Sequence, residues 1–207
     1  MNYEQVKQAA LQYADKDKSS HVIANMDTFL RVVESRVNRI LKVTKMVTRA
    51  TVPLLAGQEY YGLPADFAGV RDVEIRTNLT SSDRTTLIYL NPEQMNALSS
   101  KSGVTLAYTI VADQIHIYPA QENKLMEITY YQRLPELSGT SGKTENWLST
   151  YQPDAYIFGL LVEINSFLKD MESSQMWEQR FAASIQNIGK DDAVSRWSGT
   201  PLTIKVG

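Results

Sequence analysis

The chain has 207 residues, of which 43% are hydrophobic, which is enough for one good core or for a core with a small satellite module. Its 21 basic and 23 acidic side chains almost cancel, so it lacks the broad cationic surface that draws proteins onto nucleic acids or anionic membranes. The absence of cysteine excludes disulfides, thiolate nucleophiles and cysteine-ligated metal sites.

Residues 1–46 are predicted to form two amphipathic helices. Apolar side chains recur at helical spacing from Tyr3 to Tyr13, and a polar run then ends the pattern. A longer helix is expected from Asp27 to Leu41, with Asn25 or Asp27 as its N-cap. The first residues are too polar for a signal peptide, and no stretch approaches the roughly 20 apolar residues that span a bilayer. We therefore expect a protein that is made in the cytoplasm and has no membrane partner.

Residues 47–137 are predicted to form a small antiparallel β module, because the hydrophobic period changes to two and β-branched and aromatic residues become frequent. Strands are expected at 47–52, 70–77, 85–90, 104–110, 114–118 and 126–131. The segment 104–118 is typical of a hairpin, and Asn91-Pro92 predicts the start of a short helix over 92–99. A loop rich in Gly, Ser and Thr, 138–144, closes the module.

Residues 151–190 are predicted to form a helical hairpin. Its first helix starts at Pro153, and its second is capped by Asp170 and ends near Gly189. The expected fold is therefore α+β in a single domain over 1–207. It combines an antiparallel helical bundle, made by the long helix and the hairpin, with the inserted β module and an extended C-terminal tail over 194–207.

The C-terminal tail is strand-like, because Leu202, Ile204 and Val206 alternate with polar residues. A chain end of this kind does not fold alone. Two interpretations stay open at this point: the tail occupies an edge or groove, for example on another subunit, or it packs on its own body.

The strongest candidate for chemistry is Gly139-Thr-Ser-Gly142-Lys143-Thr144, which ends like a phosphate-binding loop. Such a loop needs four residues between its glycines and a helix directly after it, but Leu137 occupies the required first position and Glu145-Asn146 follows. The segment is thus interpreted as an exposed linker. Because the sequence also lacks metal-ligand spacing and a nucleophile elbow, we expect no enzyme activity, cofactor or metal.

Only two histidines are present, and they belong to different predicted modules. His21 is expected in a loop, and His116 in a strand with its side chain towards solvent. Eleven tyrosines and three tryptophans could stack on nucleic acid bases, but without excess positive charge we interpret them as core or interface residues.

Several short motifs follow one another in a specific order between residues 26 and 197. The long helix carries Phe29-Leu30, Glu34, Arg36, Asn38-Arg39 and Leu41, and it precedes Leu63-Pro64-Ala65-Asp66-Phe67. The later motifs are Tyr130-Tyr131, Arg133, Pro135, Leu137-Ser138, Asn146-Trp147-Leu148, Pro153-Asp154, Tyr156, Leu168-Lys169-Asp170 and Trp177. In this order they resemble the bacteriophage head-to-tail adaptor, or head-completion, proteins of the virion neck.

The resemblance implies a structural virion protein that forms a ring, usually a dodecamer, under the portal at the capsid vertex. Such a ring extends the DNA channel and offers a platform for the tail or nozzle. The implied partners are the portal protein, the tail nozzle or tail tube protein, further copies of the chain, and genomic DNA that passes without sequence-specific binding.

The resemblance also implies roles for particular residues. Portal docking is expected through the C-terminal tail, at Arg196, Trp197, Pro201, Leu202, Ile204 and Val206. Ring packing is expected through the helical hairpin, at Tyr156, Leu160, Trp177 and Phe181. The β module would face outward or towards the tail.

Three other functions stay open. The first is another tail or tail-tube component of the virion. The second is a nucleotide-binding enzyme that uses Gly142-Lys143-Thr144. The third is a DNA-binding regulator, which predicts steeply salt-dependent binding to duplex DNA.

Overall fold

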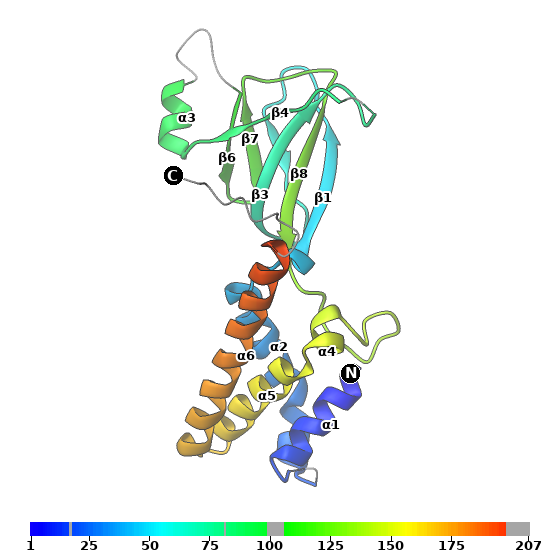
Figure 1. Ribbon diagram of the computed structural model, residues 1–207, viewed down its shortest axis with the longest axis vertical. Coiled ribbons are helices and arrows are strands. Elements are labelled where there is room, and N and C mark those ends of the chain that lie inside the picture. Colours follow the sequence, from blue (N-terminus) through cyan, green and yellow to red (C-terminus); the bar gives the residue numbers. More distant parts are fainter. Residues whose placement is uncertain (17, 81, 99–105, 198–207) are drawn as a thin grey trace, which may run out of the picture. The chain divides into compact units, whose positions relative to one another are not determined.

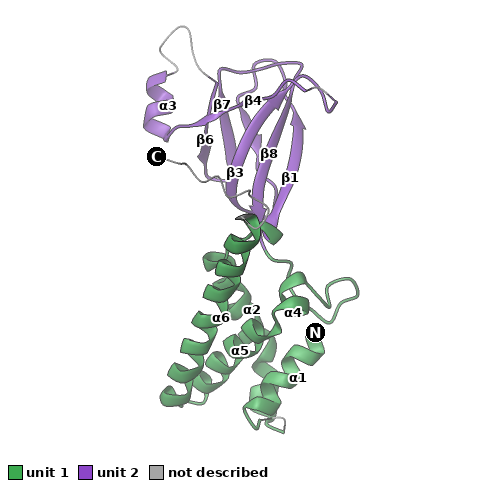
Figure 2. Cartoon of the chain, viewed as in Figure 1, with its two compact units in different colours: residues 1–45, 134–207 green, residues 46–133 purple. Residues whose placement is uncertain are grey.

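The computed structural model describes residues 1–16, 18–80, 82–98 and 106–197 and shows a mixed α+β fold. The chain divides into two compact units (Figure 2). The helical unit contains residues 1–45 and returns at Leu134, and the β unit contains residues 46–133. Whether the two units fold as the single expected domain stays a prediction.

The helical unit is built around one apolar helix. Its elements are α1 (Tyr3–Tyr13), α2 (Ser20–Ile40), α4 (Trp147–Tyr151), α5 (Pro153–Phe167) and α6 (Met171–Trp197) (Figure 1). Helix α5 packs against all of the other four, and its residues Ala155, Tyr156, Leu160, Leu161 and Ile164 are fully buried. A helix with so many buried apolar side chains has to lie inside the protein, so α5 forms the centre of this unit.

The predicted helical hairpin is present as α5 and α6, which run antiparallel. Hydrogen bonds join Ser166 to Ser174 at 2.9 Å near the turn and Ser184 to Asp154 at 2.5 Å at the far end. On the other side of α5, Gly159 lies against α2, where an added Cβ would come within 2.7 Å of Val33 Cγ1. Only a residue without a side chain allows the helices to approach so closely.

Two predicted helix boundaries are wrong. Helix α2 begins at Ser20 with Ser19 as its N-cap, so Asn25 and Asp27 lie inside the helix. The additional turns are held in place by the buried side chains of Val22 and Met26. Helix α6 does not stop near Gly189 but continues to Trp197.

The described residues of the β unit form two four-stranded sheets. The first has the order β1-β8-β3-β4 and the second β2-β7-β6-β5. The bounds are β1 (Val47–Pro53), β2 (Tyr60–Gly62), β3 (Phe67–Arg76), β4 (Thr85–Thr86), β5 (Ile88–Tyr89), β6 (Ala107–Val111), β7 (Gln114–Tyr118) and β8 (Leu125–Gln132). A short 3-10 turn, η1 (Thr44–Met46), precedes β1, and α3 (Pro92–Leu98) packs on β6.

The predicted strand 85–90 links the two sheets. Its first part, β4, pairs antiparallel with β3, and its second part, β5, pairs parallel with β6. The remaining strand pairs are antiparallel, and the hairpin predicted within 104–118 is confirmed as β6 and β7. Between the sheets lies a core of Leu54, Tyr61, Val73, Ile75, Leu87, Tyr108, Ile115, Ile117, Met126, Ile128 and Tyr130.

Candidate interaction surfaces

A buried polar network holds the returning segment 134–146 on α2. Glu34 is 3% exposed, and its Oε1 accepts a hydrogen bond from the Leu137 amide at 2.6 Å. Its other oxygen accepts from Arg31 at 2.8 Å, and the Tyr156 hydroxyl lies 3.4 Å from Oε1. Burial raises the pKa of Glu34 above the ordinary glutamate value, although the Leu137 amide and Arg31 oppose the shift.

Two asparagines complete this attachment. Asn38 Oδ1 accepts from the Leu134 amide at 2.7 Å. Asn146 caps α4 by accepting from the Ser149 amide, and its Nδ2 donates to the Pro135 carbonyl and the Tyr156 hydroxyl, both at 2.8 Å. Buried groups of this kind need partners, and here the partners are the backbone of the returning segment. The polar motif residues Glu34, Asn38 and Asn146 therefore have an architectural role.

Arg36 joins three helices by a charged contact. Its Nη2 donates to both carboxylate oxygens of Glu178 on α6, at 2.6 and 2.7 Å, and its Nη1 donates to Glu163 on α5 at 3.2 Å. The guanidinium lies 4.7 Å from the centre of the Phe181 ring. Arg36 thus fixes α2 against the helical hairpin through ion pairs and a cation–π contact.

The Gly139–Thr144 segment is arranged as a closed surface loop. The Ser138 amide donates to the Lys143 carbonyl, and the Lys143 amide donates to the Thr140 carbonyl. The backbone amide of Tyr3 in α1 donates to the Thr144 carbonyl. A phosphate-binding loop instead directs consecutive amides at its ligand and continues into a helix. This geometry supports the interpretation of the segment as an exposed linker.

The histidines do not form a site with each other. His21 is exposed on α2 and not in a loop. His116 is only 8% exposed, so its expected solvent-facing position is wrong; Tyr60 stacks on its ring at 4.3 Å, and Glu59 lies 3.3 Å from Nε2. In residues 1–16, 18–80, 82–98 and 106–197, no group of three histidine, aspartate or glutamate side chains could hold a metal ion.

The four residues expected at ring contacts differ in accessibility. Tyr156 and Leu160 are fully buried and Phe181 is 1% exposed, so all three pack within their own subunit. Trp177 is half-buried beside Tyr13 and Phe158. Their direct participation in ring packing stays a prediction.

The residues expected at the portal are only partly described. Arg196 and Trp197 belong to the last turn of α6 and not to an extended tail. Arg196 donates to the Thr44 hydroxyl at 3.0 Å, and Asp192 accepts from Arg196 and from the Thr44 amide. These contacts explain why α6 continues beyond Gly189. Pro201, Leu202, Ile204 and Val206 lie outside the described residues.

One exposed face of α6 carries no charge over more than three turns, and Arg180 lies at its edge, over the Trp177 ring. We call this uncharged surface the α6 face, and it consists of Gln175, Met176, Gln179, Ala182, Ala183, Gln186 and Asn187. Solvent-facing helix positions are normally rich in charged residues, whereas the centres of protein interfaces are depleted of charge. The composition of the α6 face is therefore that of a contact surface.

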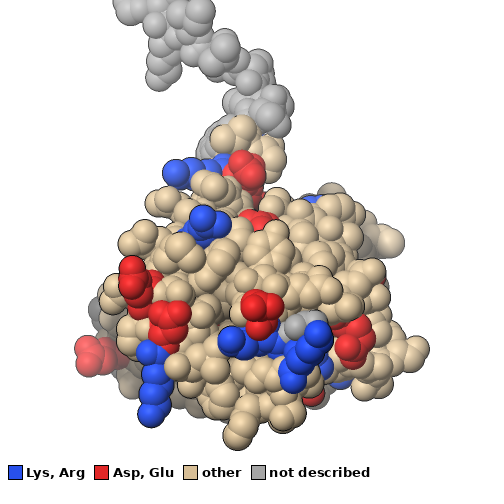
Figure 3. Space-filling view, turned by 90° about the horizontal axis from the view of Figure 1, so that it is seen from below, with Lys and Arg blue, Asp and Glu red and all other residues tan. Residues whose placement is uncertain are grey.

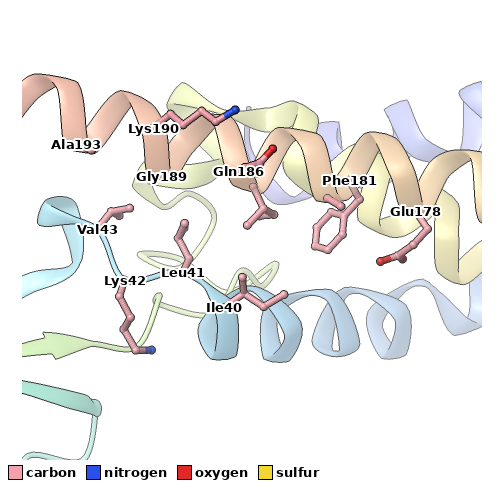
Figure 4. A pocket seen from close by; sticks show the side chains of 12 residues that line it. Ile40, Leu41, Lys42, Val43, Glu178, Phe181, Gln186, Gly189, Lys190 and Ala193 are labelled. Atoms are coloured by element: carbon pink, nitrogen blue, oxygen red, sulfur yellow. The ribbon is translucent and has the colours of Figure 1, made fainter.

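An apolar groove lies beside the α6 face, between the end of α2 and the part of α6 from Glu178 to Ala193 (Figure 4). This α2–α6 groove has a volume of about 650 Å³. It is lined by Ile40, Leu41, Lys42, Val43, Glu178, Phe181, Ala182, Ile185, Gln186, Gly189, Lys190 and Ala193. Lys42 and Lys190 lie towards one end and Glu178 lies at the other (Figure 4).

The charged side chains on the face shown in Figure 3 are of both signs. On this face, acidic and basic side chains are interspersed among uncharged ones. Phosphate backbones are bound by clustered basic side chains. Within the described part of the chain, no helix is long and apolar enough to cross a membrane.

Comparison with known proteins gives one family. The model of the family described as SU10 adaptor protein matches residues 1–205, which is almost the whole chain. No curated protein matches the chain.

Proposed function

Because the chain belongs to the SU10 adaptor protein family, a family of phage head–tail adaptors, we propose that it forms a ring under the portal of a tailed phage. In this role the ring extends the DNA channel and carries the tail or nozzle. The family match over residues 1–205 is the observation that carries the proposal. Membership also makes the protein a structural component of the virion.

The internal organisation of the helical unit supports a structural role. The buried Glu34 and the half-buried Asn38 bind the backbone of a segment about a hundred residues further along the chain, and the buried Asn146 binds Pro135 within that segment. A catalytic site would instead need nucleophile, base and oxyanion donors directed at one accessible point. The polar groups of this unit therefore support a rigid building block.

The α6 face is the surface that we propose for contacts around the ring. Its uncharged side chains suit a contact in which one subunit meets a different surface of the next, and such heterologous contacts close into a ring when the rotation matches. In this proposal Tyr156, Leu160 and Phe181 keep α5 and α6 in register from within, and Trp177 contributes at the edge. The proposed ring is a dodecamer.

The remaining contacts are proposed from the resemblance to phage adaptors and from position in the chain. Portal docking is proposed for Arg196, Trp197, Pro201, Leu202, Ile204 and Val206, and contact with the tail nozzle or tail tube for the β unit. A formal net charge of −2 suits a channel through which genomic DNA passes without sequence-specific binding.

The mass of the chain mixed with the portal ring of the same phage tests this proposal, by native mass spectrometry or sedimentation. We expect a complex that gains one copy of this chain per portal subunit. If an intact portal ring and this chain stay apart, the neck assignment fails, and a role in the tail or tail tube becomes the better explanation. Locating the protein in the particle then distinguishes these structural roles.

Deletion of residues 198–207 tests the docking segment. We expect the shortened chain to keep the described fold, because α6 ends at Trp197, but to lose attachment to the portal. Circular dichroism reports the fold, and co-sedimentation with the portal ring reports attachment. Full attachment of the shortened chain would show that docking uses another surface.

A further inference from the structure

The α2–α6 groove leaves apolar surface exposed to solvent, and such surface favours the binding of an apolar segment. Ile40 at its edge is 60% exposed, while Phe181 and Ile185 form part of its floor. Exposed apolar grooves of this size are typical of binding sites and not of solvated surface. The occupant should present several small or medium apolar side chains in a row.

The C-terminal segment 198–207 has this composition and begins next to the groove. It follows α6 directly after Trp197, and its Leu202, Ile204 and Val206 alternate with Thr203 and Lys205. Alternation in an extended chain places the three apolar side chains on one side.

The length of the segment also suits the groove. From Ala193 back to Phe181, the groove follows α6 for about 18 Å, at 1.5 Å per helical residue. Residues 202–206 would cover about 13–17 Å if extended. Residues 198–201 could span about 13 Å, which is enough for the chain to turn back from the end of α6 into the groove. Gly199 and Pro201 are residues that favour turns.

The charges are compatible with one direction of binding. If Leu202 enters near Ala193, the segment runs antiparallel to α6 and brings Lys205 towards Glu178. The Glu178 side chain is 45% exposed, so its carboxylate is accessible to a second cation besides Arg36. The opposite direction would place Lys205 near Lys42 and Lys190.

We propose that residues 202–206 occupy the α2–α6 groove of the same copy in the free protein, and that portal binding withdraws them. This inference rests on the proposed function, because it gives the docking segment a second location before assembly. Ala182 and Gln186 belong to both the groove and the α6 face. The bound segment therefore covers part of the ring contact, and ring closure is restricted to copies whose segment the portal has taken.

An introduced disulfide tests the location of the segment, and the absence of native cysteine makes the result unambiguous. In the full-length chain, Ile40→Cys is combined with Ile204→Cys. The matched control combines Ile204→Cys with Val32→Cys, an exposed position on the same helix outside the groove. We expect an intramolecular disulfide in the first variant and only traces in the control.

The same variants give the outcomes that overturn the inference. Equal cross-linking in both, cross-linking in neither, or mainly intermolecular disulfides would each exclude a segment bound in the groove of its own copy. Addition of the portal ring before oxidation should abolish the intramolecular disulfide, and its persistence on portal-bound copies would contradict withdrawal. Portal attachment of the reduced variants is measured in parallel, so failure of the neck assignment is recognised separately from failure of the cross-link.

Truncation after Trp197 tests the consequence for assembly. Without the segment, the α6 face is uncovered. We therefore expect the truncated chain to self-associate more than the full-length chain at the same concentration. Sedimentation of each chain in the absence of the portal measures this difference. Unchanged self-association of a folded truncated chain would overturn the proposed restriction on ring closure.

Discussion

The helical unit is assembled from two distant stretches of the chain, whereas the β unit is one continuous stretch. In the helical unit, side chains such as Glu34 and Asn38 bind the backbone of a segment about a hundred residues away. In the β unit, the strand ladders themselves join distant residues, as in the pairing of β1 with β8. In the helical unit, a few polar side chains thus attach the returning segment to α2, while in the β unit many backbone groups share the task of joining distant residues.

The β unit nevertheless contains one concentrated polar contact. Arg76, 8% exposed, donates to the buried carboxylate of Glu127, which Arg49 also approaches at 3.4 Å. The comparison therefore predicts that substitutions lower stability at one polar contact in the β unit and at several positions in the helical unit.

Glu127→Leu should give the largest effect. It leaves the Arg76 guanidinium buried without its counter-ion, which typically costs about 3–5 kcal/mol. Urea denaturation measures the free energy of unfolding. The double change Arg76→Leu with Glu127→Leu should recover most of the loss, because neither charge remains buried. An unchanged unfolding midpoint in Glu127→Leu would show that Arg76 finds another partner.

Gly159→Ala should have an intermediate effect in the helical unit. The new Cβ would lie 2.7 Å from Val33 Cγ1 and 3.2 Å from Phe181 Cε2, so α2 and α5 must separate. Overpacking of this kind costs about 1–3 kcal/mol. Thermal denaturation measures the loss, and Val33→Ala should restore part of it in the double variant by removing the closest atoms. Additive losses in the two variants would contradict this contact.

Glu34→Gln should have the smallest effect and should alter the pH dependence of stability. Burial raises the pKa of Glu34, so the folded state binds the proton more tightly than the unfolded state. Its contribution to stability is present below the ordinary glutamate pKa and is lost as pH rises through the raised pKa. Glutamine cannot titrate, so the slope of unfolding free energy against pH should be reduced in that window.

Glu136→Gln gives a graded comparison for this prediction. Glu136 approaches Arg31 at 3.2 Å with its side chain 67% exposed, and its charge adds to the rise in the pKa of Glu34. We therefore expect Glu136→Gln to reduce the slope less than Glu34→Gln does. Equal slopes in Glu34→Gln and the unchanged protein would show that the raised pKa of Glu34 makes no measurable contribution.

Periodic apolar residues were sufficient to predict much of the fold. Helix α1 and strand β7 lie where the spacing of side chains places them, and α5 starts at Pro153, as that proline predicted. Short elements were missed, because β2 has three residues and α4 five, too few to show a period. The predicted end of α6 was wrong because Gly189 was interpreted as the end of the helix. The contacts of Asp192 and Arg196 with Thr44, which hold the last turns in place, cannot be seen in the local sequence.

The interaction surfaces were harder to predict than the fold. The partners of Asn38 and Glu34 in the returning segment lie 96 and 103 residues further along the chain, beyond any local pattern. Tyr156, Leu160 and Phe181 were expected at the ring because the resemblance implies ring packing through the helical hairpin, but these large apolar side chains are buried within the subunit. The α6 face had a usable signal, since its exposed helical positions lack charge over more than three turns.

The strands through which the chain enters and leaves the β unit lie next to each other, with Val47 opposite Tyr131. During vectorial synthesis on the ribosome, α1 and α2 emerge first but lack α5 until the whole insertion has followed. The insertion can complete its own core in that interval. The chain enters and leaves the β unit at points about one strand spacing apart, so a tight turn could replace the whole β unit. For the same reason, the helical unit could accept a different module at this position during evolution.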